Sequence, residues 1–96
     1  MTVTITKNGN TVTLALEGSL DAQAAPELQD KVQNIDNNTK SMVIDMAKLQ
    51  YIASAGIRQL VMIYKRMGGK VVIKNASVEL MDIFHITGID RMIRFE

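Results

Sequence analysis

Apolar residues alternate with threonine or alanine in two runs near the amino terminus, residues 3–5 and 12–16. A spacing of two is typical of strands that have one buried and one wetter face. Asn8-Gly9 lies between the runs and favours a tight turn, because both residues tolerate positive φ. We therefore expect an antiparallel hairpin whose second strand ends at Gly18.

Three later segments carry apolar residues three or four positions apart, which is the spacing of one helix face. They predict helices over residues 22–35 and 54–67, and a third helix between its cap residue Ser77 and Gly88. Pro26 suits the first turn of the first helix, where its missing N–H costs little. Asn37-Asn38 and Gly68-Gly69 are typical stop signals after the first two helices.

Short apolar runs at residues 42–44 and 71–73 predict buried strands, and residues 91–95 predict a last short strand. Leu49, Tyr51 and Ile52 are expected to anchor a loop. The resulting order is β-β-α-β-α-β-α-β. It predicts one α/β domain over residues 1–96, with a mixed, largely parallel sheet, an amino-terminal hairpin and helices packed against it.

Parallel strands bring their carboxyl ends to one edge of a sheet, and sites in open α/β sheets lie there. We expect the loops 18–21, 47–54 and 75–77 to meet at this edge. Asp21, Ser54, Arg58 and Asn75 should therefore share one surface that faces a partner.

Composition narrows the classes of function. The net charge is +1 and aromatic residues make up 4%, which argues against direct binding of nucleic acid. The chain has no cysteine, no signal-peptide pattern and no apolar run of the roughly 20 residues that a membrane helix needs. We expect a cytoplasmic protein with no membrane association.

Ser54 is the strongest candidate for chemistry, and it allows two interpretations. A serine at a helix start is most often an N-cap, which stabilises the helix by about 1 kcal/mol. The small neighbours Ala55 and Gly56 leave the hydroxyl open and suit close approach by another protein. A phosphate on Ser54 would meet the positive end of the helix, so the serine is also a candidate phosphorylation site.

Enzymatic interpretations are weaker. A nucleophilic serine needs a base, and the single histidine, His85, lies in an apolar stretch of the third helix. Asp21 and Asp45 could together hold Mg²⁺ or act as acid and base, but each also suits local hydrogen bonding in a turn. The sequence has no phosphate-binding glycine loop. We expect no enzyme activity, no metal and no cofactor.

Four segments resemble the STAS domains of anti-sigma factor antagonists. The loop motif Leu49–Ile57 follows the strand Val43–Met46 and resembles the family's Ser-Ser-Ala-Gly-Leu variant. The stretch Gly18–Asp21 is similar to the family's Gly-x-Leu/Ile-Asp motif. The segments Leu80–Gly88 and Ile93–Glu96 are similar to its tail. Ala53 stands where many members have aspartate.

The resemblance implies a switch in partner choice. The unphosphorylated domain, a monomer when free, would bind an anti-sigma factor, usually a GHKL-type serine kinase, and so release a sigma factor. Phosphorylation of Ser54 by that kinase would end binding, and a PP2C-type phosphatase would reset it. The implied partner-binding residues are Asp21, Ser54, Ala55, Gly56, Arg58 and Asn75.

Two other interpretations stay open. The domain could be a passive interaction subunit, such as the STAS partner of a lipid-transport ABC complex. It could also be a STAS domain that binds a nucleotide or another small ligand.

Overall fold

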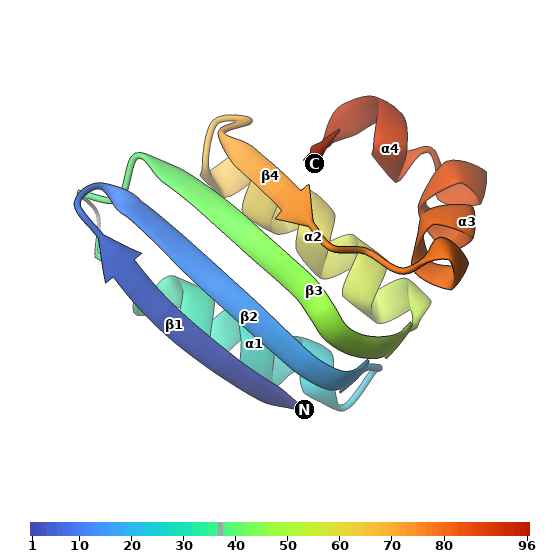
Figure 1. The fold of residues 1–96 in the computed structure, drawn as a ribbon. Helices are drawn as coiled ribbons and strands as arrows, with labels where there is room; N and C mark the ends of the chain where they lie inside the picture. The colour runs from blue at the N-terminus through green and yellow to red at the C-terminus, as the bar shows by residue number, and fades with distance from the viewer. Residues whose placement is uncertain (37) are drawn as a thin grey trace.

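The computed structural model describes residues 1–36 and 38–96, which form one five-stranded sheet with helices packed against it (Figure 1). The strands lie side by side in chain order; β1 and β2 are antiparallel and the other neighbours are parallel. The predicted α/β architecture is therefore confirmed. The strands are β1 (Thr2–Asn8), β2 (Thr11–Leu20), β3 (Ser41–Ile52), β4 (Val71–Lys74) and β5 (Arg94–Phe95). The helices are α1 (Ala24–Gln33), α2 (Ser54–Arg66), α3 (Val78–Thr87) and the one-turn α4 (Ile89–Met92).

The hairpin turns at Gly9-Asn10, one residue later than expected. Asn8 is the last residue of β1 and pairs with Thr11, while Gly9 has a φ of +63°. Glycine in the first central position is typical of a type II′ turn, whose twist matches that of the flanking strands. Asn8 therefore belongs to the strand pair, and the turn needs positive φ only at Gly9.

β2 and β3 are both longer than expected. The pairing register between them shifts between Ala15 and Glu17 and again between Gly18 and Ser19, so β2 continues through Gly18 to Leu20. The expectation that residues 49–52 form a loop is wrong. They are the last part of β3, in which Leu49 and Ile52 are buried. The register shifts change the spacing of buried residues, which hides this part of the strand from a period-two pattern.

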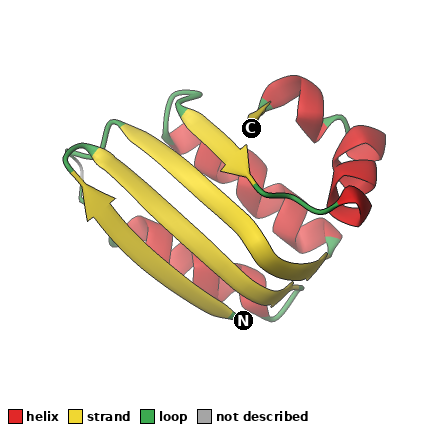
Figure 2. Cartoon of the chain, in the orientation of Figure 1, coloured by secondary structure: helices red, strands yellow, loops and turns green. Residues whose placement is uncertain are grey.

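In the part of the chain that the structure describes, α1 and α2 lie next to each other on one face of the sheet, and the opposite face carries no helix (Figure 2). The side chains between the helices and the sheet form the core, because alternate strand residues point toward the helices. These alternate strand residues are fully or almost fully buried: Val12, Leu14, Leu16, Met42, Ile44, Met46, Val71 and Ile73. Burial of one such aliphatic side chain contributes about 1.5–3 kcal/mol.

α1 is shorter than the predicted helix over residues 22–35. Asp21 Oδ1 accepts hydrogen bonds from the backbone N–H groups of Gln23 and Ala24, at 3.1 Å and 2.9 Å, which holds residues 22–23 in a turn before the helix. The helix ends at Gln33, before the predicted Asn37-Asn38 stop; Asn37 lies outside the described residues.

The carboxyl-terminal segment differs from the single strand predicted over residues 91–95. Gly88 ends α3 with a φ of +81°, as expected, and starts a further turn of helix, α4. Ile89 and Ile93 are both buried, and Ile93 N–H donates to the Ile89 carbonyl at 2.9 Å. A spacing of four residues therefore places both isoleucines on the core side, and only Arg94 and Phe95 pair with β4.

Candidate partner-binding site

The ends of β2 and β3 are joined where the chain leaves both strands. Leu20 pairs with Ile52, and the Ala53 N–H donates to the Leu20 carbonyl at 2.9 Å. Asp21 and Ser54 are the residues that follow Leu20 and Ala53. The structure thus places both residues at the same edge of the sheet.

Gly56 lets α2 approach this edge closely. It is buried, and a Cβ atom added to it would lie 2.7 Å from the Leu20 Cγ and carbonyl oxygen, and 2.8 Å from the Ile52 Cγ1. Backbone at that distance cannot move aside without moving the strand. The small size of Gly56 is therefore required by packing inside the domain, whereas Ala55 is half-buried beside it.

Ser54 does not cap α2. The N-cap residue is Ala53, whose extended backbone precedes Ser54, the first helical residue. The N–H groups of Gly56 and Ile57 both donate to the Ala53 carbonyl. Ser54 is exposed, and among the described residues its hydroxyl has no hydrogen-bond partner. Capping, the commonest role of such a serine, therefore does not explain Ser54.

Ser77 shows the contrast, because it caps α3 as predicted. Its Oγ accepts a hydrogen bond from the Leu80 N–H at 3.2 Å. The two serines at helix starts thus differ by one position in the helix. Ser77 precedes the first helical residue and uses its hydroxyl, whereas Ser54 is the first helical residue and leaves its hydroxyl free.

The surroundings of Ser54 on α2 are free of negative charge. The first turn of α2 contains no acidic residue, and the helix start carries a partial positive charge. Arg58 lies one turn further along, is exposed, and takes part in no ion pair within the described part of the chain. The α2 side of this edge therefore favours an added negative charge, whereas Asp21, which follows β2 at the same edge, adds a carboxylate.

Asn75 lies apart from Asp21 and Ser54. β4 ends at Lys74, which pairs with Asp45, whereas β3 runs seven residues further to Ile52. The Asn75 Nδ2 donates to Asp45 Oδ1 at 3.0 Å, and the Ala47 N–H donates to the same oxygen at 3.0 Å. These two hydrogen bonds, that from Asn75 above all, hold the pKa of Asp45 below its ordinary value of 3.8.

Asp21 and Asp45 do not form a pair. Asp45 pairs with Ala15 across β2 and β3, while Asp21 follows Leu20, which pairs with Ile52. At a rise of about 3.3 Å per residue, six positions along β2 separate them by roughly 20 Å. Each carboxylate instead bonds nearby N–H groups, so local hydrogen bonding explains both. Among the described residues, no group of three or more His, Asp or Glu side chains could hold a metal ion.

Comparison with known protein families gives a match over almost the whole chain, since the model of the STAS domain covers residues 2–96. The chain belongs to the STAS family. The resemblance inferred from the sequence motifs is therefore confirmed, and the family's anti-sigma factor antagonists are non-enzymatic regulatory proteins.

Similar proteins carry related names. The Anti-sigma-B factor antagonist of Bacillus subtilis is 27% identical over 94 residues, which cover 95% of this chain and 86% of the relative. A crystal structure of an anti-sigma factor antagonist from Mycobacterium paratuberculosis has a TM-score of 0.87 at 18% identity, covering 98% of this chain and 83% of that one. The phosphorylated form of the Bacillus protein SpoIIAA has a TM-score of 0.76 at 16% identity, covering 99% and 91%.

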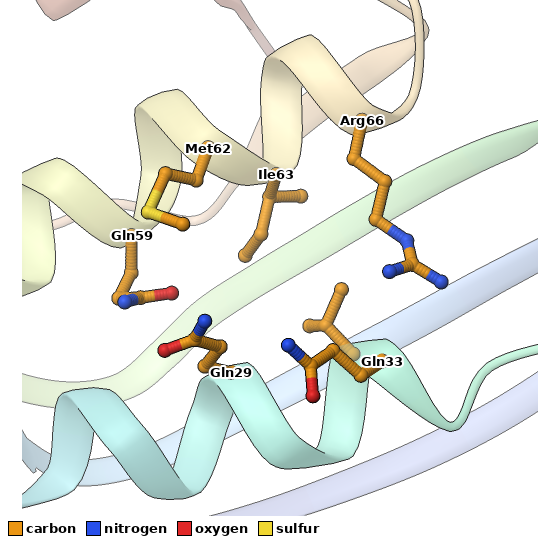
Figure 3. A pocket seen from close by; sticks show the side chains of 7 residues that line it. Gln29, Gln33, Gln59, Met62, Ile63 and Arg66 are labelled. Atoms are coloured by element: carbon orange, nitrogen blue, oxygen red, sulfur yellow. The ribbon is translucent and has the colours of Figure 1, made fainter.

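The structure also shows a feature of this STAS domain that the motifs do not indicate. A groove of about 210 Å³ lies between α1 and α2 and is lined by three glutamines and Arg66 (Figure 3). Gln59 is four positions before Ile63, on the buried side of α2. This spacing could have marked Gln59 as a polar residue on an apolar face.

In the part of the chain that the structure describes, no helix is both long and apolar enough to cross a membrane.

Proposed function

We propose that this STAS domain is an anti-sigma factor antagonist whose binding to an anti-sigma factor is switched off by phosphorylation of Ser54. The anti-sigma factor is a GHKL-type serine kinase, and a PP2C-type phosphatase restores the unphosphorylated form. The domain acts in the cytoplasm and is a monomer when free. It has no catalytic role of its own.

The free hydroxyl of Ser54 is the observation that carries the proposal. It is exposed at the first residue of α2, is not used for capping, and lies on backbone that is bonded to the end of β2. A kinase can therefore reach it, and modification breaks no hydrogen bond of the domain. The names of the similar proteins support the same function, and the SpoIIAA structure shows that a protein of this fold is phosphorylated.

The proposed partner surface surrounds this serine. We include Asp21, which follows β2 at the same edge, and Ala55 and Arg58, which belong to the first turns of α2. Gly56 is buried and allows α2 to pack closely against Leu20 and Ile52 below this surface. We assign Asn75 a supporting role, because its amide is engaged by Asp45 at the end of β4. A partner that binds this surface covers the Ser54 side chain, and in the unphosphorylated form its interface fits closely around an uncharged hydroxyl group.

Phosphorylation opposes such a fit by charge. A phosphate adds about −1.5 to −2 charges at pH 7, and an interface that covers it must remove its water. An uncompensated charge in an interface costs several kcal/mol, which corresponds to a loss of affinity of roughly a hundredfold or more. The positive end of α2 and Arg58 offset the charge for the domain itself, so the domain stays folded.

The test is a calorimetric titration of a GHKL-type kinase of the same organism with wild type, Ser54→Ala and Ser54→Asp, together with mapping of the phosphate by mass spectrometry. Ser54→Ala should bind about as tightly as wild type and stay unmodified. Ser54→Asp should bind about a hundredfold more weakly. Ser77→Asp is the matched control, because aspartate also caps a helix and adds the same charge at a different helix start.

Ser77→Asp should change the affinity by less than about threefold, since the added charge lies outside the proposed interface. Equal binding of wild type and Ser54→Asp would contradict the switch, and so would a phosphate on Ser41 or Ser77. The domain would then be better described as a passive interaction subunit, of the kind found with lipid-transport ABC complexes.

A further inference from the structure

The groove between α1 and α2 contains the one polar side chain that is buried among the described residues. Gln59 is only 8% exposed. Its side chain points into the groove, toward Gln29 on the facing helix (Figure 3). An almost fully buried glutamine thus presents its amide to the groove.

The chemistry of the groove is that of an anion site with an apolar floor. Val32 and Ile63 are buried at its base, and Gln29, Gln33 and Gln59 supply amide groups that both donate and accept. Arg66 lies at the end of the groove near Gln33, as Figure 3 shows, and forms no ion pair within the described ranges. Among the described residues that line the groove, none is acidic.

An acidic residue on the neighbouring surface is already engaged. Asp36 and Arg66 both line an adjacent hollow, but the Asp36 carboxylate accepts a hydrogen bond from Lys7 Nζ at 2.8 Å and another from the Asn38 N–H at 2.9 Å. The Lys7 bond, followed by the Asn38 bond, holds the pKa of Asp36 below its ordinary value. The guanidinium of Arg66 therefore stays available to an outside anion.

We propose that this groove binds a small carboxylic acid with a short apolar stem. The planar guanidinium of Arg66 pairs with the carboxylate through two parallel hydrogen bonds, and the amide of Gln33 completes its surroundings. The stem lies on Val32 and Ile63, where Gln59 and Gln29 contact its far end. This site is separate from Ser54 and independent of the proposed switch.

Size and charge select this class of ligand over others. A volume of about 210 Å³ equals roughly seven water molecules in the liquid, which suits an acid of about six to nine non-hydrogen atoms. A phosphate group carries close to two charges, whereas the groove offers one cation. A nucleotide is too large, and none of the described lining residues is aromatic and able to stack on its base.

The test is a titration followed by NMR of ¹⁵N-labelled protein, with hexanoate as the probe. We expect saturable shifts of the backbone signals of Gln29, Gln33, Gln59 and Arg66, with a dissociation constant in the millimolar range, as for other ligands of this size. Arg66→Gln should weaken binding at least about tenfold. Lys65→Gln is the matched control, because Lys65 is the adjacent exposed cation and does not line the groove.

Further arms separate the proposal from simpler explanations. Hexanol has the same stem without the carboxylate, so it should bind at least about tenfold more weakly than hexanoate. A blocked glutamate, with acetyl and amide ends, tests whether the carboxylate can come from a peptide side chain. Ser54→Asp should bind hexanoate as wild type does, whether or not Ser54 is a switch.

Three results would overturn the site. They are the absence of saturable shifts at these residues with both acids, equal binding of hexanol and hexanoate, and equal affinities of Arg66→Gln and Lys65→Gln. Thermal unfolding of each variant checks that it is folded. Gln59→Leu provides a second variant of similar size. Because residue 59 meets the apolar end of the stem, this variant should keep the fold and bind hexanoate within about threefold of wild type. A loss as large as that of Arg66→Gln would contradict the proposed orientation of the acid.

Discussion

The sheet has two places where parallel strands end and polar side chains gather, and they differ in how their polar atoms are used. We call the place where β4 stops, opposite Asp45, the shorter end of the sheet. There the Asp45 Oδ1 accepts hydrogen bonds from the Asn75 side chain and from the Ala47 backbone N–H. At the longer end, where β2 and β3 stop together, the Ser54 hydroxyl has no partner among the described residues. The first place stabilises the domain, whereas the second offers a free group on fixed backbone. Polar residues near strand ends thus become candidates for function only when the fold itself leaves them unsatisfied.

The largest effect should come from breaking the close packing beneath Ser54. Gly56→Ala places a methyl group 2.7 Å from the Leu20 carbonyl oxygen, so α2 must move away from β2. We expect a loss of about 2–4 kcal/mol in the free energy of unfolding, as for other overpacked sites. Urea denaturation followed by circular dichroism measures this loss.

Gly88→Ala is the control for that experiment. Gly88 has a φ of +81°, and no atom lies within 4 Å of an added Cβ. Its substitution therefore costs only backbone strain, about 1–2 kcal/mol. If Gly56→Ala costs no more than Gly88→Ala, the packing of α2 against β2 is looser than a contact of 2.7 Å requires.

A smaller effect should come from the shorter end. Asn75→Gly keeps the positive φ of this position, 63°, and removes the hydrogen bond to Asp45. We expect a loss of about 0.5–1 kcal/mol at pH 7, because the bond is exposed to water. Asp45 has a lowered pKa, so its contribution is present above its ordinary pKa of 3.8 and is lost as the pH falls through the folded value.

The difference between wild type and Asn75→Gly should therefore shrink as the pH falls below about 4. Denaturant unfolding between pH 7 and pH 3 measures it. The same substitution in an Asp45→Ala background isolates the pair, since only the effect of glycine on the unfolded chain should remain there. A difference that stays constant with pH would show that the Asp45 carboxylate does not carry the effect.

The smallest effect should be that of Ser54→Ala on stability. Since the hydroxyl makes no hydrogen bond within the described part of the chain, the free energy of unfolding should change by less than about 0.5 kcal/mol. Ser77→Ala is the matched comparison, because it removes a cap bond to the Leu80 N–H and should cost about 1 kcal/mol. Equal losses in the two variants, measured by thermal unfolding, would mean that Ser54 has a structural role after all.

The order of elements followed from the sequence because most of them carry an uninterrupted pattern. The alternation of residues 12–16 and the helical spacing over residues 54–67 each continue for several residues without a break. The end of β3 was missed because register shifts alter its spacing. α4 was missed because two isoleucines four residues apart give too short a pattern to separate a turn of helix from a strand.

The candidate site was predicted in part, for a similar reason. Chain order alone places the residues after β2 and β3 at one edge, so Asp21 and Ser54 were expected together and are found together. Asn75 was misplaced because the sequence does not show that β4 ends seven residues short of β3. The hydroxyl of Ser54 is free because Ala53, and not Ser54, is the N-cap of α2. A hydrophobic pattern does not locate a helix start to within one residue, so the sequence could not show this.

The junction between Ala53 and Leu20 also has a consequence for timing. Switches that work by moving loops or domains relax over microseconds to milliseconds and populate intermediate shapes. Here the hydrogen bond from the Ala53 N–H to the Leu20 carbonyl, and the close packing of Gly56 against Leu20 and Ile52, hold the backbone around Ser54 in one arrangement. For the proposed switch, no relaxation of the domain separates the arrival of the phosphate from its effect. The response time is then set by the turnover of the kinase and the lifetime of the complex, both of which the partner controls.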